Sequence, residues 1–422
     1  MKILVLGSGA REHAIILALK SEDAGHELLA APGNAGIARD AQIVDVDMLD
    51  GAAVTSFANE SGVNLVVVGP EAPLVAGVAD VLREHGIPVF GPGRAAAALE
   101  GSKAFAKRIM EDAEVPTGRA VHARTLEEVA GALDAYGAPH VVKADGLAAG
   151  KGVIVTSDRQ AALDHAAQYL PTGPVLVEEF LSGPEVSLFF VSDGDTVRAL
   201  SPAQDFKRAL DGDEGPNTGG MGAYSPLPWL TERFGDEASF VQQVTDEVAL
   251  PVIRRLDEEG TPFIGLLYAG LILTDAGVRV IEFNARFGDP ETQVVLPRLI
   301  TPLSRVLLAA ATGTLEDEPA PQFSDEVAVT VVVASEGYPE APVTGRPITG
   351  IDAAEAIEGV HIVHAATKAS DGALLATGGR VLNVVARGSD FREARERAYR
   401  GIAEISLEGA HHRSDIAAHV AE

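Results

Sequence analysis

The chain has 422 residues, 46% of them hydrophobic and 22% charged, a composition typical of a globular protein with roughly two to four domains. It contains no cysteine, which excludes disulfides, thiolate catalysis and cysteine-bound zinc. The net charge of −28 argues against a nucleic-acid surface, because that kind of binding depends on lysine and arginine neutralising phosphates.

No apolar run approaches the length of a membrane span, and the apolar run at the N-terminus is too short for the core of a signal peptide. We therefore expect a cytoplasmic protein that acts on small molecules, without a membrane or nucleic-acid partner.

Short apolar runs alternate with helix-like segments over about the first hundred residues. Because each run stops at Gly or Pro, the pattern predicts a parallel α/β domain with ligands at the carboxyl ends of its strands. Gly7, Gly9 and Arg11 open the first helix, whose N-terminus could bind a phosphate. A dinucleotide site is the alternative, but the G-x-G-x-x-G fingerprint fails at Glu12.

A helix is predicted after Leu99. Ser102 is a plausible N-cap, and Lys103 and Lys107 lie one turn apart on the same face. Pro116 follows the helix and ends it.

The stretch VVKADGLAAGKGV, residues 141–153, combines glycines with two lysines. Glycines let backbone N–H groups approach a phosphate closely, and lysines add mobile positive charge. The stretch is not a Walker A loop, because Gly152 stands where Ser or Thr is needed. Taken alone, a glycine-rich hairpin with solvated lysines fits equally well.

Two later stretches carry acids and a second glycine-rich loop. Adjacent Glu178 and Glu179 end an apolar strand and are either a solvated edge or part of a nucleotide pocket, in which a carboxylate meets the ribose. The loop GPNTGGMGAYSP, residues 215–226, would be an ordinary surface loop if it stood alone. Residues 263–273 then predict a buried strand, or a strand pair near Gly270.

Glu282 and Asn284 lie two positions apart on the next predicted strand, so both point to one face of the sheet. Such a pair of oxygen ligands suits Mg²⁺ whose remaining positions are filled by ATP phosphates. Arg286, Asp289 and Glu291 continue this polar run.

The C-terminal part begins near Phe323 and alternates strands with one helix from about Asp390 to Ile405, which predicts a small α+β domain. His411 and His412 have no acids at metal-binding spacing, so we assign them a surface or packing role.

Six segments resemble one enzyme family in order and separation: LEGSKAF, KADGLAAGKGV, VEEFLSGPEVS, GPNTGGMGAYSP, LYAGL and IEFNARFGDPETQ. They are similar to the phosphoribosylamine–glycine ligases, which are ATP-grasp enzymes of purine biosynthesis. GSGAREHA and GGRVLNVVARG resemble the family's first and last domains, so the resemblance covers essentially the whole chain. The chain departs from the family at Phe206, Ala285 and Ala366, where His, Cys and Gly are usual.

The resemblance implies an α/β and α+β multidomain protein. Its parts would be an N-terminal α/β substrate-binding domain (1–101), an ATP-grasp domain (102–322) with a mobile subdomain at about 117–187, and a C-terminal domain (323–422). It implies ligation of glycine to 5-phosphoribosylamine through glycyl phosphate, with ATP and Mg²⁺ or Mn²⁺, by a monomer or, as the alternative, a dimer.

The resemblance also implies the site residues. Those that bind ATP would be Lys103, Lys143, Gly146, Gly150, Lys151, Gly152, Glu178, Glu179, Phe180, Leu181 and Glu185. The metal ligands would be Glu282 and Asn284, and the catalytic residues Arg286, Asp205 and Lys207. Those that bind the substrates would be Gly7, Gly9, Arg11, Glu71, Asn217, Thr218, Gly219, Gly220, Met221 and Asp289.

Three other functions stay open. Another ATP-grasp carboxylate–amine ligase would share the nucleotide motifs. A dinucleotide-dependent dehydrogenase would explain the first hundred residues but would leave the glycine-rich loops unused. A non-catalytic nucleotide-binding regulator would not need the pair Glu282 and Asn284.

Overall fold

The computed structural model describes residues 1–146 and 152–422. Its N-terminal part is a parallel five-stranded sheet, as predicted, in the order β3-β2-β1-β4-β5. The central strand is apolar and buried, as a parallel strand covered on both faces must be. The strands are β1 (Lys2–Gly7), β2 (Glu27–Pro32), β3 (Gln42–Ile43), β4 (Leu65–Val68) and β5 (Val89–Phe90). The helices are α1 (Ala10–Ser21), α2 (Ile37–Asp40), α3 (Gly51–Ser61), α4 (Glu71–Ala76), α5 (Val78–Glu84) and α6 (Arg94–Gly101).

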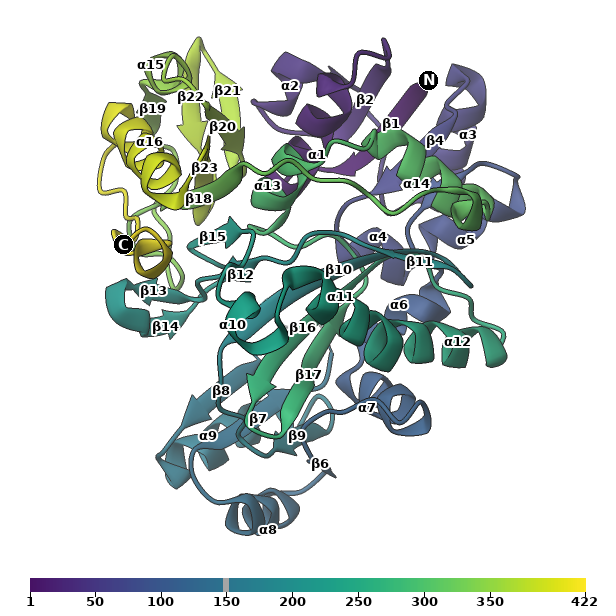
Figure 1. Ribbon diagram of the computed structural model, residues 1–422, viewed down its shortest axis with the longest axis vertical. Helices are drawn as coiled ribbons and strands as arrows, with labels where there is room; N and C mark the ends of the chain where they lie inside the picture. The colour runs from purple at the N-terminus through teal and green to yellow at the C-terminus, as the bar shows by residue number, and fades with distance from the viewer. Residues whose placement is uncertain (147–151) are drawn as a thin grey trace.

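Helix α7 (Lys103–Asp112) leads into a small subdomain at the far end of the molecule (Figure 1). The predicted N-cap is confirmed, since the Ser102 hydroxyl accepts the Phe105 N–H at 3.2 Å. The subdomain has an antiparallel sheet with a core of its own, covered by two helices. In sheet order its strands are β6 (Ala120–Ala123), β9 (Val175–Glu178), β7 (His140–Ala144) and β8 (Val153–Thr156), and its helices are α8 (Leu126–Tyr136) and α9 (Arg159–Tyr169).

A second antiparallel sheet crosses the middle of the molecule (Figure 1). Residues 263–273 prove to be one long strand, not a pair. In sheet order the strands are β11 (Val197–Ala199), β10 (Glu185–Asp193), β16 (Ile264–Thr274) and β17 (Gly277–Asn284). Around it lie α10 (Leu230–Phe234), α11 (Glu237–Val244), a π-helical turn (Thr245–Ala249), α12 (Leu250–Glu258), α13 (Thr292–Val295) and α14 (Leu303–Thr312).

The C-terminal part is built on a five-stranded sheet. Two of its strands come from the middle of the chain. In sheet order these strands are β12 (Gln204–Asp205), β15 (Gly222–Ser225), β18 (Val327–Ala334), β23 (Arg380–Gly388) and β20 (Val360–His364). A smaller sheet contains β21 (Thr367–Ser370), β22 (Ala373–Ala376), β19 (Pro347–Thr349) and β24 (Ser406–Leu407). The hairpin β13 (Arg208–Leu210) and β14 (Glu214–Asn217) lies beside them, with α15 (Ile351–Glu355) and α16 (Phe391–Glu404). Helix α16 confirms the predicted C-terminal helix, and Asp390 caps it.

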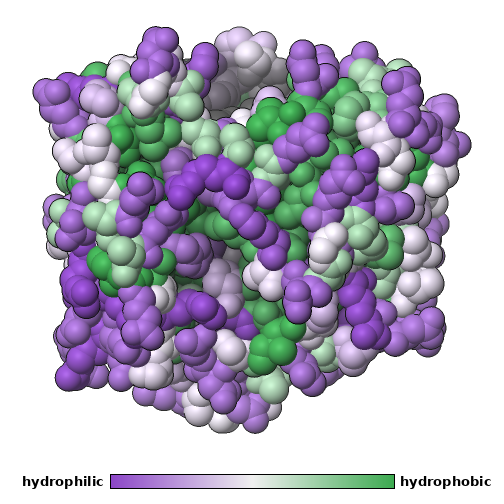
Figure 2. Space-filling view, turned by 90° about the horizontal axis from the view of Figure 1, so that it is seen from above, coloured by the Kyte–Doolittle hydropathy of each residue, from purple (hydrophilic) through white to green (hydrophobic). Residues whose placement is uncertain are grey.

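The arrangement brings three parts of the chain to a common junction. The N-terminal sheet and the C-terminal sheets lie side by side at one end, and the central sheet joins them to the small subdomain (Figure 1). The face seen in Figure 2 carries hydrophilic side chains over much of its area, with smaller hydrophobic groups between them. In the described part of the chain, no helix is long and apolar enough to cross a membrane.

Candidate active site

A buried glutamate holds two lysines together where the small subdomain meets α7. Glu178, the last residue of β9, contacts Lys143 Nζ at 2.6 Å through one carboxylate oxygen and Lys107 Nζ at 3.1 Å through the other. Burial disfavours the charged form of each group, but the opposite charges outweigh it, so that the pKa of Glu178 is lowered and the pKa of Lys143 is raised. The Glu178 carboxylate therefore faces lysines, and Lys107 joins the cluster although its sequence position did not mark it as a site residue.

The start of the glycine-rich stretch is tied to the N-terminus of α7. Asp145 Oδ1 accepts the Lys103 N–H at 2.7 Å, and Lys103 Nζ donates to the Gly146 carbonyl at 3.2 Å. Ala144 N–H donates to the Gly152 carbonyl at 2.7 Å, which closes the base of this stretch. Burial lowers the pKa of Lys103. The expected ATP-binding residues Gly150 and Lys151 lie outside the described residues.

The strand end after β9 presents an aromatic side chain to solvent. Phe180 is 44% exposed, which is unusual for an aromatic residue beside a buried strand. The neighbouring Glu179 is paired instead with Arg119, whose Nε lies 2.7 Å from the carboxylate. Leu181 follows and is partly buried. An exposed ring at a strand end is suited to stacking on a flat base.

The pair predicted to bind metal lies at the end of β17. Glu282 and Asn284 pair with Gly270 and Tyr268 of β16, and the buried Phe283 between them points the other way. The one irregularity of this ladder falls before Glu282, so both oxygen-bearing side chains share a face, as the spacing predicts. A carboxylate and an amide oxygen are ligands that Mg²⁺ accepts, and the half-buried position leaves room for phosphate oxygens. Within the described residues, no cluster of three or more metal-ligating side chains is present.

The charges of the two clusters are coupled across the junction. Glu282 interacts electrostatically with both Lys103 and Lys143. Lys143 Nζ also donates to the Ile281 carbonyl, next to Glu282, at 3.4 Å. The lysines expected to bind phosphate and the pair expected to bind metal, from the small subdomain, α7 and the central sheet, thus lie together.

Arg286 connects the metal-binding strand to the N-terminal part. Its Nη2 lies 2.8 Å from Glu100 Oε1, and its Nε lies 3.6 Å from Glu71 Oε2. Asn284 Oδ1 accepts a long hydrogen bond from Nη2 at 3.4 Å. Burial lowers the pKa of the guanidinium, but the two carboxylates raise it further, so Arg286 stays charged. Glu100, which also accepts the Ala285 N–H at 2.8 Å, was missed by sequence reasoning although it stands in the LEGSKAF segment.

A second ion cluster surrounds Lys207. Its Nζ lies 2.5 Å from Glu185 Oε2 and 2.9 Å from Asp205 Oδ1. Glu185, which the resemblance places at the ribose, is therefore paired with a lysine in this structure. Close by, the buried Glu291 accepts hydrogen bonds from Tyr268 Oη at 2.5 Å and from Ser187 Oγ at 3.2 Å. Burial raises the pKa of Glu291.

The glycine-rich loop of residues 215–222 is fastened at both of its sides. Thr218 donates its N–H and its hydroxyl to the Lys207 carbonyl, at 2.8 and 2.9 Å. Arg380 Nη1 donates to the Gly219 carbonyl at 2.6 Å, and Arg380 Nη2 lies 3.0 Å from Asp289 Oδ2. At Gly220, with φ +108°, a Cβ would come 2.4 Å from the Pro290 ring, so only glycine fits.

Two further residues of this loop, Asn217 and Met221, have different neighbours. Asn217 ends β14 and pairs with Arg208 of β13, whereas Met221 is fully buried and its backbone bonds to the Phe206 carbonyl at 2.7 Å. The loop therefore links the ion cluster around Lys207 to the C-terminal part.

A side chain of α1 itself fills the space beside the glycines that precede this helix. Glu12, only 1% exposed, accepts the Gly9 N–H at 2.6 Å and the Arg11 Nε–H at 2.7 Å. A Cβ at Gly7 or at Gly69 would overlap the Glu12 side chain. The third-glycine position of a dinucleotide fingerprint thus carries a carboxylate that fills the space beneath the turn, which disfavours a pyrophosphate there. Arg11 Nη1 donates to the Phe287 carbonyl at 3.1 Å.

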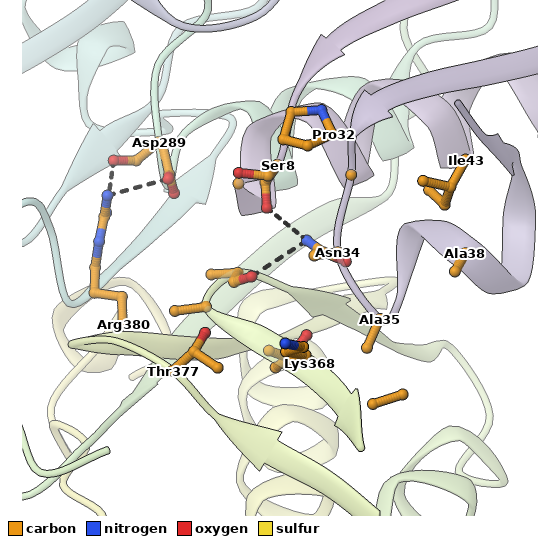
Figure 3. Close-up of a pocket in the computed structure, with 16 residues that line it drawn as sticks. Ser8, Pro32, Asn34, Ala35, Ala38, Ile43, Asp289, Lys368, Thr377 and Arg380 are labelled. Carbon is orange, nitrogen blue, oxygen red and sulfur yellow. Dashed lines mark hydrogen bonds and ion pairs between the residues drawn. The ribbon is translucent and has the colours of Figure 1, made fainter. Parts of the chain in front are cut away.

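A cavity of about 870 Å³ opens between the carboxyl ends of β1 and β2 and the C-terminal strands β21 and β22. Figure 3 shows Lys368 and Thr377 on one side of it, Asn34 and Ser8 on the other, and the pair Asp289 and Arg380 at one end. Lys368, Thr377 and Arg380 come from the C-terminal part, which sequence reasoning had not assigned to the site. The motif GGRVLNVVARG, which contains Arg380, was the available signal.

Most of the chain matches family models, in three pieces that follow one another in chain order. The descriptions are "Phosphoribosylglycinamide synthetase, N domain" for residues 1–100, "ATP-grasp (A) domain" for 101–292 and "C domain" for 328–419. A phosphoribosylamine–glycine ligase from Leifsonia xyli subsp. xyli is 69% identical over 99% of this chain and 100% of its own length. The chain belongs to the phosphoribosylamine–glycine ligase family.

Other comparisons agree with this family. The phosphoribosylamine–glycine ligase of Streptomyces coelicolor is 60% identical, and the match covers all of both chains. The crystal structure of the Thermotoga maritima ligase superimposes with a TM-score of 0.82 at 33% identity, covering 98% of this chain and 100% of that one. The chain is therefore an ATP-dependent ligase of purine biosynthesis, and the geometry above belongs to an ATP-grasp enzyme.

Proposed function

We propose that this ligase activates glycine as glycyl phosphate and transfers the glycyl group to 5-phosphoribosylamine at the junction of its three parts. The observation that carries this proposal is the position of Lys143, whose Nζ donates to the Ile281 carbonyl beside Glu282 at 3.4 Å, together with the electrostatic interaction of Lys103 and Lys143 with Glu282. It supports a site in which lysines bind phosphates next to a metal ion. Both reactants of the first step, ATP and the glycine carboxylate, are anions, so charge neutralisation is what the step requires. A covalent nucleophile is not needed.

ATP binds along the line from Phe180 to Glu282. Lys103 and Lys143 hold its phosphates, with Gly146 beside Lys103, and Phe180 with its neighbouring backbone frames the adenine. Glu282 and Asn284 hold Mg²⁺ or Mn²⁺, which supplies Lewis-acid stabilisation of the transferring phosphoryl group. The small subdomain, at about residues 117–187, has its own core and closes over the nucleotide as a unit.

Glycine lies beside Arg286. This arginine stays charged in a buried setting, so it can bind the glycine carboxylate and then the developing acyl phosphate. Asp205, Lys207 and the loop from Asn217 to Gly220 border the same place and orient the amino group and the phosphoryl oxygens.

5-Phosphoribosylamine occupies the cavity of about 870 Å³. Lys368, for which the described part of the chain shows no ion-pair partner, suits the substrate's phosphate, and the Thr377 hydroxyl offers a hydrogen bond to phosphate or ribose. Glu71 contacts Arg286 and, beside the proposed glycine position, would face the attacking amine.

Isotopic labelling tests the proposed route. Glycine carrying ¹⁸O in its carboxylate should deliver one labelled oxygen to inorganic phosphate for each molecule of product, because that oxygen leaves with the phosphate when the amine attacks. An adenylate route would put the label in AMP and release pyrophosphate. Unlabelled phosphate, with ADP and glycinamide ribonucleotide still formed, would overturn the glycyl phosphate intermediate.

A further inference from the structure

Two buried histidines, one from each end of the chain, meet beside the cavity. His13 lies on α1, and His364 is the last residue of β20. Each is only 2% exposed, and their rings lie edge to face with centroids 5.6 Å apart. Gly36 passes between them so closely that a Cβ there would come 2.4 Å from His364 and 2.6 Å from His13. The contact is therefore a close junction between the N-terminal and the C-terminal parts.

Hydrogen bonding determines the tautomer of His13. Its Nδ1 accepts the backbone N–H of His364 at 2.8 Å, and because a backbone N–H can only donate, Nδ1 carries no proton. The proton is therefore on Nε2, which donates to Asp40 Oδ2 at 3.0 Å. Lys20 holds the other Asp40 oxygen at 2.7 Å. His13 is thus a neutral imidazole that joins a carboxylate of one domain to the backbone of the other.

The Asp40 carboxylate is a stable acceptor for this bond. Burial raises the pKa of its carboxyl, but the hydrogen bonds from His13 and Lys20 and the charge of Lys20 outweigh that effect and lower the pKa to about 2. Asp40 therefore stays ionised at every pH at which an enzyme would be assayed, and the His13 tautomer does not change with it.

The junction continues directly into the lining of the cavity. His364 Nδ1 lies 3.0 Å from Thr367 Oγ1, and Thr367 precedes Lys368 in the cavity wall. From the other side, Asn34 Nδ2 donates to the carbonyls of His364 and Ala365, at 3.0 and 3.2 Å. The strand that carries Lys368 is therefore placed relative to the N-terminal part by the His364 backbone.

Two further polar links between these two parts are weaker. The Ala35 N–H donates to the Thr367 carbonyl at 3.4 Å, which is a long hydrogen bond. The Arg39 and Glu355 pair, at 3.0 Å, involves an arginine side chain that is 50% exposed. Exposed ion pairs contribute little, because water screens the charges and two long side chains must be ordered. The buried bond from His364 N–H to His13 is costly to lose, since the donor would be left without a partner.

We propose that His13 is a positioning residue for 5-phosphoribosylamine: its Nδ1 fixes the segment from His364 to Lys368 against the N-terminal loop, and so sets the width of the cavity. The inference rests on the proposed function of that cavity. It predicts an effect on one substrate only, because ATP and glycine bind at the other side of Arg286.

Two substitutions separate the two bonds of His13. His13→Gln keeps a donor that can reach Asp40 but provides no acceptor at the Nδ1 position, whereas His13→Asn keeps that acceptor and loses the bond to Asp40. We expect His13→Gln to raise the KM for 5-phosphoribosylamine about tenfold, and His13→Asn to raise it less. The KM values for ATP and glycine and kcat should stay within about twofold.

Because 5-phosphoribosylamine is short-lived, inhibition by ribose 5-phosphate supplies a second readout. Its inhibition constant against the wild-type enzyme and both variants should rise in parallel with the KM. The thermal unfolding temperature of each variant shows whether the protein is still folded, and so distinguishes unfolding from a displacement of the cavity-lining segment. Equal changes in the KM of all three substrates, or an unchanged KM for 5-phosphoribosylamine in a folded His13→Gln protein, would overturn the positioning role.

Lys368→Gln distinguishes this inference from the function proposed for the cavity. If Lys368→Gln raises the KM for 5-phosphoribosylamine and His13→Gln does not, only the positioning role fails. If Lys368→Gln leaves both that KM and the inhibition by ribose 5-phosphate unchanged, the cavity is not the ribosylamine site, and the inference falls with it.

Discussion

The proposed nucleotide side and the proposed ribosylamine side of this ligase are assembled by different kinds of interaction. On the nucleotide side, buried charges face one another: Glu178 bridges Lys107 and Lys143, and Glu100 pairs with Arg286. On the ribosylamine side, a neutral histidine and the amide of Asn34 hold two domains together around a cavity. The comparison teaches that the first side holds its lysines and arginine in buried ion pairs, whereas in the second the two domains are joined by uncharged hydrogen bonds from His13 and Asn34, with the Asp289–Arg380 ion pair at one end of the cavity.

This difference has a physical reason. Triphosphate brings several negative charges, so its site needs several lysines, and buried lysines would repel one another without an internal counter-ion such as Glu178. A sugar monophosphate brings fewer charges and more hydroxyl groups. Its site therefore needs fewer cations and depends more on lining residues that are correctly positioned for hydrogen bonds. Substitutions on the two sides should therefore fail in different ways.

The largest effect is expected at the metal ligand. Glu282→Gln removes a formal charge from the ligand set and should lower kcat about a thousandfold, while the fold survives because the side chain is only half buried. ADP release should be measured at limiting and at saturating Mg²⁺. Asp275→Asn, at the exposed turn of the same hairpin, removes the same charge and should leave turnover unchanged. Wild-type turnover of Glu282→Gln at limiting Mg²⁺ would refute the assignment.

The next effect is on stability at the nucleotide side. Glu178→Gln leaves two lysines without their counter-charge and should lower the free energy of unfolding by about 3 kcal/mol at pH 7. Because the pKa of Glu178 is lowered in the folded state, its contribution is complete above the unfolded value of 4.5 and is lost as the pH falls further. The gap between wild type and variant, measured by urea unfolding, should therefore shrink below pH 4.5. A gap that is the same at pH 7 and pH 4 would contradict the ion-pair account.

A somewhat smaller effect is expected at Arg286. Lysine keeps the charge but cannot contact Glu100, Glu71 and a bound carboxylate in one plane, so Arg286→Lys should lower kcat/KM for glycine about a hundredfold. Steady-state kinetics with glycine as the varied substrate measure this change. Arg254→Lys, on the exposed face of α12, is the matched control. A loss confined to the KM for ATP would move Arg286 away from the glycine position.

The smallest effect is expected at Asp40 on the ribosylamine side. Asp40→Asn keeps an oxygen that can accept the His13 Nε2–H, so it should cost only about 1–2 kcal/mol of stability and change the KM for 5-phosphoribosylamine a few-fold. The folded-state pKa of about 2 lies below the unfolded value of 3.8, so this contribution is complete above pH 3.8 and disappears toward pH 2. Urea unfolding at pH 7 compares it directly with Glu178→Gln. If the two amide substitutions cost the same, the contrast between the two sides is wrong.

Much of the local structure could be predicted from the sequence alone. The parallel N-terminal sheet, the Ser102 cap, the shared face of Glu282 and Asn284 and the C-terminal helix all follow from short-range rules of spacing and capping. Several of these segments also carried the resemblance to the ligase family. A motif can be identified from its residue types and their spacing, without knowledge of its neighbours in space.

Only the tertiary structure decided which partner each charged side chain has. Glu185 meets Lys207, Asp289 meets Arg380, and His13 meets His364, although the last two pairs are 91 and 351 residues apart in the chain. The sequence states the charge and the hydrogen-bonding capacity of a residue, but burial and proximity set its strength, and these arise only when strand ends from three domains converge. The sequence therefore determined which functional groups this ligase has. The convergence of its sheets determined which lysine and arginine side chains are held in ion pairs and where the cavity lies.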